Sequence, residues 1–260
     1  MLLSGCIVIL SSCKKNQAEN CPPNENPSCN FMQSRLIESF MIENDDDTSC
    51  KTMYKYDVSE RLISTTTIYK YCNPCKTVET ITYRGNEITM IRENFDRYNQ
   101  VTYKADLVFT LDAQGRSSEI VFYTGLDTQL IIRKYFYYDA FDQTISSCSY
   151  TCDKSANYQN KTLQDSTIYQ WENGNIAASK EKTDAAFHSL EYLPETDGRN
   201  LFIMGNNYLH LLYNPDVHMA FSKNLLKDDN SDFMFDANGR ICRNKYHSRH
   251  AKYYYRYKCI

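Results

Sequence analysis

The feature that most constrains the fold is a recurring phrase in which an extended, aromatic segment ends at an aspartate and is followed by a tight turn. It reads FTLDAQGR at 109–116 and FMFDANGR at 233–240, and shorter versions occur at 54–57 and 135–139. Aspartate caps such a turn with its side chain, and glycine accepts the left-handed conformation that returns the chain. The residues expected to form these turns are Asp57, Asp112, Gly115, Asp139, Gly174, Asp236 and Gly239.

The segments between the turns alternate as strands do. In 101–111, Ala105, Leu107 and Phe109 fall on one face, whereas Lys104 and Asp106 fall on the other. Such a period of two indicates half-buried antiparallel strands. The chain is therefore predicted to be all-β, an antiparallel meander of about ten to twelve strands that is curled or closed into a barrel-like sheet.

Two short segments have apolar residues at helical spacing. Residues 33–41, with Leu36, Ile37 and Phe40, suggest a short helix before the first strand, and 207–212 suggest either a second helix or an inserted loop.

The N-terminus reads as a lipoprotein export signal. The apolar run IVIL at 7–10 is followed by small residues and Cys13, so residues 1–12 are predicted to be removed and Cys13 to carry lipid. Cys6 is a rival acylation site with less apolar sequence before it, and a buried N-terminal strand is the alternative to a signal. Residues 13–33 are polar, rich in Asn and Pro, and expected to form a flexible tether. Residues 34–260 are expected to form a single β domain.

Composition narrows the class of partner. The net charge is −3 and the basic residues are scattered, which argues against a nucleic-acid partner. The chain has 22 tyrosines, which favour a pleated, half-buried surface. No apolar run approaches the roughly 20 residues that a membrane-spanning helix needs.

Eleven cysteines in an exported chain favour disulfides over thiols. The pair Cys242 and Cys259 flanks a predicted hairpin, where the two are expected to lie opposite one another, and Cys21 with Cys29 is plausible inside the tether. Cys148 and Cys152 are joined only if a turn separates them, because in an extended strand their Cα atoms lie about 13 Å apart.

The remaining motifs that carry chemistry favour structural roles. The pair Cys72 and Cys75 has redox spacing but sits at a turn rather than at the start of a helix. The histidines of 247–250 have no supporting ligand at zinc spacing. The acidic run 228–232 has phenylalanine where a calcium loop needs glycine. No metal site, cofactor or catalytic residue is predicted.

The segment FSKNLLK at 221–227, the FDANGR hairpin that follows it and the Lys14-Lys15 pair together resemble an uncharacterised family. Its members are Bacteroidetes-type lipoproteins with a domain of unknown function of porin-like β fold. This chain departs from the family pattern at Leu226, where the family more often has proline. The resemblance implies a fold and an outer-membrane location, on either the periplasmic or the cell-surface face, far more than an activity.

These features favour a lipid-anchored cell-envelope protein that is a non-enzymatic binding or structural module. The lipid anchor is expected to attach it to the membrane. The sequence does not specify whether a further partner is a small molecule, a glycan or a protein. The alternatives are a barrel-like carrier of a small hydrophobic or sugar ligand and an envelope hydrolase. A transmembrane barrel is disfavoured because the face of Thr102, Lys104 and Asp106 is too polar to meet lipid.

Overall fold

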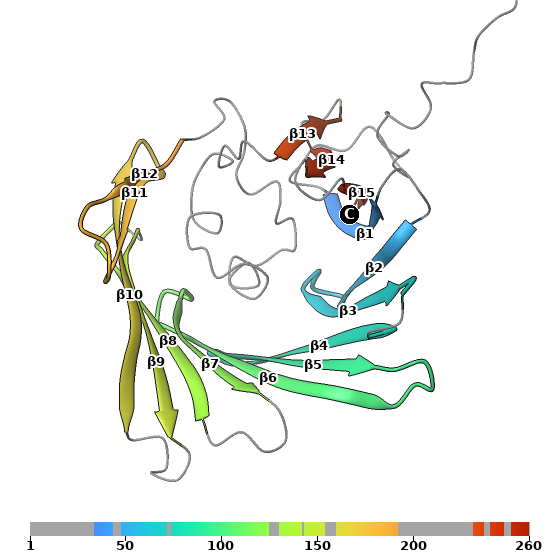
Figure 1. The fold of residues 1–260 in the computed structure, drawn as a ribbon, viewed down its shortest axis with the longest axis horizontal. Helices are drawn as coiled ribbons and strands as arrows, with labels where there is room; N and C mark the ends of the chain where they lie inside the picture. Colours follow the sequence, from blue (N-terminus) through green and yellow to red (C-terminus); the bar gives the residue numbers. More distant parts are fainter. Residues whose placement is uncertain are drawn as a thin grey trace, which may run out of the picture.

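A computed structural model describes residues 34–43, 48–71, 74–124, 130–141, 143–153, 160–191, 231–236, 240–246 and 251–259. All strands in these ranges belong to one curved antiparallel sheet (Figure 1). The strands are β1 (Ser34–Glu43), β2 (Thr48–Tyr56), β3 (Leu62–Tyr69), β4 (Lys76–Arg84), β5 (Glu87–Phe95), β6 (Val101–Leu111), β7 (Ser117–Thr124), β8 (Leu130–Tyr138), β9 (Thr144–Asp153), β10 (Lys161–Glu172), β11 (Asn175–Glu181), β12 (His188–Ser189), β13 (Ser231–Phe235), β14 (Ile241–Tyr246) and β15 (Ala251–Cys259).

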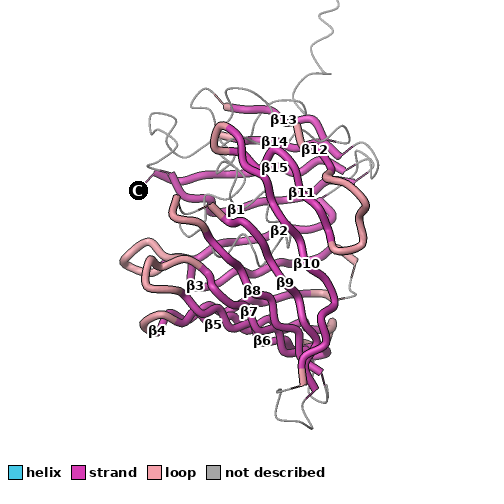
Figure 2. Tube along the Cα trace, turned by 90° about the vertical axis from the view of Figure 1, so that its left-hand side faces the viewer, coloured by secondary structure: helices cyan, strands magenta, loops and turns pink. Residues whose placement is uncertain are grey.

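The sheet is a meander whose two chain ends meet. Its order is β12-β11-β10-β9-β8-β7-β6-β5-β4-β3-β2-β1-β15-β14-β13, so the first strand pairs with the last. Within the described part of the chain the sheet is not closed, and β12 and β13 are its edges. The predicted all-β antiparallel meander is therefore confirmed, and its fifteen described strands exceed the number expected. Figure 2 shows the same strands from the side.

The segment expected to be a short helix at 33–41 is instead strand β1. The pairing of β1 with β15 shifts between Leu36 and Glu38, a β-bulge that breaks the period of two. Because of this shift, Leu36 packs with Tyr257 while Phe40 stacks on Tyr254, with ring centroids 5.0 Å apart. The bulge produced apolar spacing that resembled a helix, and the helix prediction was wrong. The second expected helix, 207–212, lies outside the described residues.

Connections alternate between the two ends of the sheet because every pair of neighbouring strands is antiparallel. One end, called the hairpin end below, carries the turns that follow β2, β4, β6, β8, β10 and β13. The other, called the loop end, carries the connections that follow β3, β5 and β11, among others. The chain enters β1 at the hairpin end.

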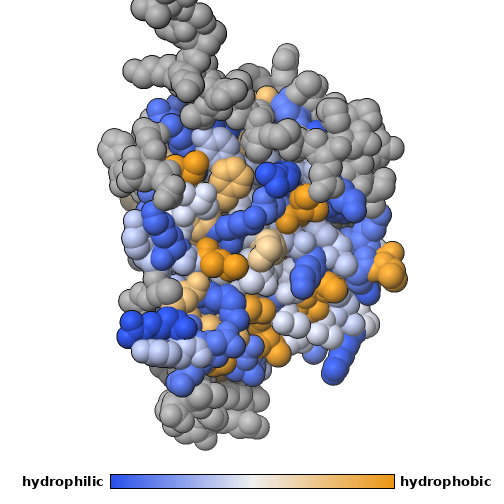
Figure 3. Space-filling model, turned by 90° about the vertical axis from the view of Figure 1, so that its right-hand side faces the viewer, coloured by the Kyte–Doolittle hydropathy of each residue, from blue (hydrophilic) through white to orange (hydrophobic). Residues whose placement is uncertain are grey.

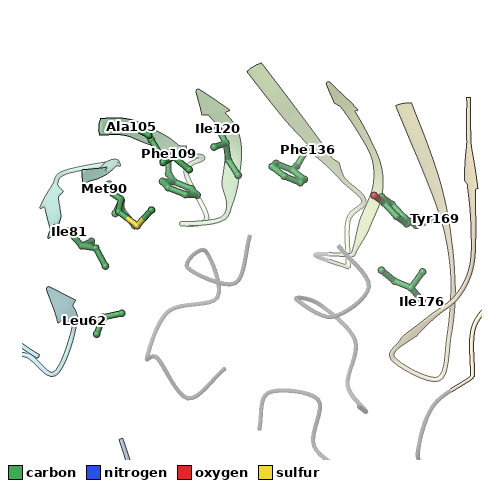
Figure 4. Close-up of a cluster of buried hydrophobic side chains, with 11 residues drawn as sticks. Leu62, Ile81, Met90, Ala105, Phe109, Ile120, Phe136, Tyr169 and Ile176 are labelled. Atoms are coloured by element: carbon green, nitrogen blue, oxygen red, sulfur yellow. The ribbon is translucent and has the colours of Figure 1, made fainter. Parts of the chain in front are cut away.

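The main apolar cluster lies on the inner side of the curve (Figure 4). In β6, Ala105, Leu107 and Phe109 are buried, as the alternation predicts, and β5 and β7 add Met90 and Ile120. Each fully buried side chain of this kind stabilises the fold by about 1.5–3 kcal/mol. In the described residues, no helix has the length and apolar character needed to cross a membrane.

Candidate functional site

The hairpin after β6 shows how the aspartate turns are built. The Asp112 carboxylate accepts hydrogen bonds from the backbone N–H groups of Gln114 and Arg116, at 3.0 and 2.9 Å. The Arg116 Nε donates to the other carboxylate oxygen at 2.7 Å. Gly115 has a φ of 77°, which glycine adopts without strain. One aspartate thus fixes both the turn and the arginine that ends it.

Aspartates begin four other turns of the same kind. Asp57, Asp96 and Asp139 each accept backbone N–H bonds from residues two and four positions later. Asp236 accepts one from Arg240 at 3.0 Å. The turn containing Gly174 differs, because it is a two-residue connection in which Asn173 and Gly174 both have positive φ. Gly239 lies outside the described residues.

The arginine at the end of three of these turns stacks on a tyrosine. The guanidinium carbon of Arg116 lies 4.4 Å from the ring centroid of Tyr138. The equivalent pairs are Arg61 with Tyr83 at 4.5 Å and Arg240 with Tyr257 at 5.4 Å. Each pair joins a hairpin to a strand further along the sheet.

The same tyrosines hold the strand that leaves the turn. Their hydroxyls donate to the backbone carbonyl of the residue after the arginine: Tyr83 to Leu62 at 2.8 Å, Tyr138 to Ser117 at 2.7 Å and Tyr257 to Ile241 at 2.6 Å. Burial raises the pKa of Tyr138 and Tyr257 above the usual range, and at Tyr257 the Asp236 carboxylate adds to this. The hydroxyls therefore stay protonated and act as donors.

A tryptophan takes the tyrosine's place in the hairpin after β8. Gln143 ends that turn instead of arginine, and the Trp171 Nε1 donates to the Thr144 carbonyl at 2.9 Å. At the hairpin end the Asp–Arg–Tyr unit is thus a structural repeat with one divergent copy, whereas the Asp96 turn at the loop end closes on Gln100. Sequence reasoning noted the arginine only as the last residue of the repeated phrase and missed its tyrosine partner, although the Arg61–Tyr83 and Arg116–Tyr138 separations are identical and could have revealed it.

A polar cluster lies on the inner face beside the apolar one. Glu79 is buried in β4, and its Oε1 accepts hydrogen bonds from the Arg92 Nε and Nη2, both at 2.8 Å. The Thr65 hydroxyl donates to its Oε2 at 2.6 Å. Both carboxylate oxygens are therefore occupied, as a buried charge requires.

Other inner-face groups bond across neighbouring strands in the same way. Thr77 donates to Asn94 at 2.9 Å, and Ser147 and Tyr169 share a bond of 3.0 Å. Tyr54 bonds to Ser39 at 3.0 Å, and burial raises the pKa of Tyr54 to about 12, with Glu79 adding to the effect. These pairs stabilise the sheet rather than leave reactive groups exposed.

Some of the described cysteines are disulfide-bonded and others are free thiols. Cys50, Cys148 and Cys152 have free thiols, and because β9 is one extended strand Cys148 and Cys152 are too far apart to join. Cys75 and Cys242 are disulfide-bonded to partners that lie outside the described side chains. The β14–β15 register aligns Arg243 with Tyr254, so it does not set Cys242 opposite Cys259, and that part of the prediction was wrong. The side chain of Cys259 is not described, so a disulfide between Cys242 and Cys259 stays a prediction.

The predicted lipidation site Cys13, the pair Cys21 and Cys29, and the histidines of 247–250 all lie outside the described residues. Among the residues that the structure does describe, no three His, Cys, Asp or Glu side chains gather as they would around a metal ion.

Comparison with known proteins supports the fold. No family model and no curated protein matches the chain. A porin-like protein from Bacteroides uniformis is similar with a TM-score of 0.51 and 11% identity, covering 86% of this chain and 96% of that one. A porin-like protein from Bacteroides vulgatus has a TM-score of 0.28 and 8% identity, covering 85% and 97%. At such identity the first likeness shows the fold alone: this chain has the architecture of a porin-like protein.

Proposed function

We propose that this protein is a lipid-anchored component of the cell envelope, of the Bacteroidetes lipoprotein type, in which the curved sheet acts as a rigid binding or structural module rather than as an enzyme. One observation carries the non-enzymatic part. Among the residues that the structure describes, the buried carboxylate of the inner face is tied into the Glu79–Arg92–Thr65 cluster. The bonds of this cluster link three neighbouring strands, which supports a structural role for it.

The structural role is favoured over that of a carrier. A carrier of a small hydrophobic or sugar ligand needs an apolar cavity lined by side chains that can contact the ligand. The apolar inner side chains instead pack against one another, and Phe109 and Ile176 are fully buried. Native mass spectrometry of protein purified from its own host distinguishes the two, because a carrier retains ligand mass and a structural module does not.

The anchor is tested by labelling in a bacterial host with an alkyne analogue of palmitate. Wild type is expected to take up the label and to sediment with the membrane fraction. Cys13→Ser is expected to lose the label, whereas Cys6→Ser, the matched control, keeps it. Label that survives Cys13→Ser but disappears in Cys6→Ser would move the anchor to the rival site, and label on neither wild type nor variants would overturn the proposal.

A further inference from the structure

We propose that the loop end of β3–β6 carries a docking surface for anionic lipid headgroups. This surface, called the basic–aromatic rim, consists of Lys70, Tyr71, Lys76, Arg97 and Tyr98. It extends the proposed envelope function, because it adds a second, non-covalent contact with a membrane to the lipid on Cys13.

The rim is built from two loops that hold each other in place. The backbone N–H of Cys75, in the β3–β4 loop, donates to the Phe95 carbonyl at 2.9 Å. The Lys76 Nζ donates to the Asn99 side chain, in the β5–β6 loop, at 2.6 Å. The Asp96 carboxylate caps the second loop by accepting the Tyr98 N–H at 2.8 Å. These bonds hold Cys75 and Lys76 against the second loop before any partner binds, which lowers the entropic cost of binding there.

Its aromatic side chains project into solvent. Tyr71 is 70% exposed and Tyr98 is 68% exposed, and the neighbouring Val101 is 51% exposed. Large exposed side chains scattered singly are ordinary, but several on two adjoining loops mark an interaction site. Figure 3 views the molecule from the side on which these loops lie in Figure 1, and hydrophobic and hydrophilic residues are interleaved there.

Each basic side chain of the rim lies over an aromatic ring. The Lys70 Nζ is 5.6 Å from the centroid of Tyr71, the guanidinium carbon of Arg97 is 5.0 Å from that of Tyr98, and the Lys76 Nζ is 4.2 Å from that of Phe95. Cations and tyrosine rings presented together are the side chains that proteins place at a membrane–water interface.

The charge of the rim fits an anionic partner. The segments 69–76 and 95–100, which contain the rim, have three basic residues, Lys70, Lys76 and Arg97, and a single acidic one, Asp96. That carboxylate is occupied by the backbone N–H groups of Tyr98 and Gln100. Because the exposed rings project from loop ends, they suit a broad lipid surface better than a ligand that needs a cleft.

The test is vesicle sedimentation with the full chain carrying both Cys6→Ser and Cys13→Ser, so that no acyl chain contributes and the result does not depend on lipidation. Vesicles are made of phosphatidylcholine alone or of phosphatidylcholine with phosphatidylglycerol. We expect binding to be tighter to the anionic vesicles and to weaken as salt is added. Each basic residue near an anionic surface contributes about fivefold in affinity, so Lys70→Gln with Arg97→Gln should weaken binding about 25-fold.

Tyr71→Ser with Tyr98→Ser should also weaken binding to anionic vesicles. The matched controls are Lys55→Gln and Phe141→Ser, which change an exposed lysine on β2 and an exposed aromatic residue at the hairpin end. Circular dichroism checks that every variant keeps its strand content. The proposal is overturned if anionic vesicles bind the protein no better than neutral ones, or if the controls weaken binding as much as the rim variants. It is also overturned if a soluble polyanion such as dextran sulfate displaces the protein from labelled anionic vesicles as well as unlabelled anionic vesicles do.

Discussion

The two ends of the sheet use the same pairing, a cation over an aromatic ring, in opposite surroundings. At the hairpin end, Arg240 lies over Tyr257, and its side chain is only 1% exposed. At the loop end, Arg97 lies over Tyr98, a ring that is 68% exposed. The difference is the aspartate: Asp236 binds the buried guanidinium at 2.7 Å, whereas Asp96 caps its own loop through backbone N–H groups.

This comparison shows what decides whether such a pair builds the fold or serves as a contact surface. A buried guanidinium is tolerated only when its charge is matched and its donors are bonded. Arg240 at the hairpin end meets this condition because Asp236, four residues earlier, matches its charge. The Tyr257 hydroxyl then bonds to the backbone of the residue that follows the arginine. An exposed pair has no such requirement, and its interaction energy of about 0.5–1 kcal/mol leaves the side chains available for a partner.

The largest expected effect comes from breaking the buried pair. Arg240→Ala should lower the free energy of unfolding by about 3–5 kcal/mol, because the Asp236 carboxylate, only 11% exposed, would be left without the arginine that matches its charge. Arg61→Ala removes the same kind of residue from a turn where the arginine is 47% exposed, and should cost less than about 1 kcal/mol. Urea unfolding followed by circular dichroism measures both.

A double variant sharpens this result. If burial of an unmatched charge causes the loss, Asp236→Ala combined with Arg240→Ala should be less destabilising than the sum of the two single changes. Equal losses for Arg240→Ala and Arg61→Ala would contradict the role assigned to burial.

The fold was predictable where the decisive interactions are local. The alternation around Leu107 and the aspartate turns at Asp57, Asp112 and Asp139 depend on residues within one strand or one hairpin, and the sequence therefore indicated an antiparallel meander. Strand β1 was mistaken for a helix because its register depends on β15, at the other end of the chain. Strand β12 has only two residues, which are too few for an alternation of apolar and polar residues to be recognised in the sequence.

The candidate sites were less predictable because they depend on pairing between distant strands. Glu79, Arg92 and Thr65 come from three strands and meet only through the register of β3, β4 and β5. The rim depends on two loops that the sheet sets side by side, with Cys75 of one loop bonded to Phe95, the last residue of β5, where the other loop begins. The alternation of apolar residues along one strand does not encode such registers. The equal spacing of Arg61–Tyr83 and Arg116–Tyr138 at the hairpin end does carry part of this information.

A smaller effect is expected from the tyrosine hydroxyls. Tyr257→Phe keeps the ring over Arg240 but removes the donor to the Ile241 carbonyl, a buried bond of 2.6 Å. Losing that buried bond should cost about 1 kcal/mol in the free energy of unfolding. Tyr98→Phe at the loop end serves as the control and should change the free energy by less than about 0.5 kcal/mol. A similar loss in both variants would show that the hydroxyl of Tyr257 does not close the hairpin.

The smallest effect concerns acid stability at the hairpin end. Burial opposes ionisation of Asp112, but the N–H groups of Arg116 and Gln114 and the Arg116 guanidinium outweigh it and lower the pKa of Asp112. Because this folded-state pKa is below the unfolded value of about 4, the stabilisation is present above that pH and is lost as the pH falls through the folded pKa. The difference in free energy of unfolding between wild type and Asp112→Asn should therefore be constant at neutral pH, below about 1 kcal/mol, and shrink in acid. Gln114→Ala, in the same turn, is the control and should keep the acid dependence of wild type. A difference that stays constant down to the lowest pH at which the protein is folded would mean that Asp112 acts through turn geometry alone, and the hairpin end would then owe less to charge than its buried Arg240 suggests.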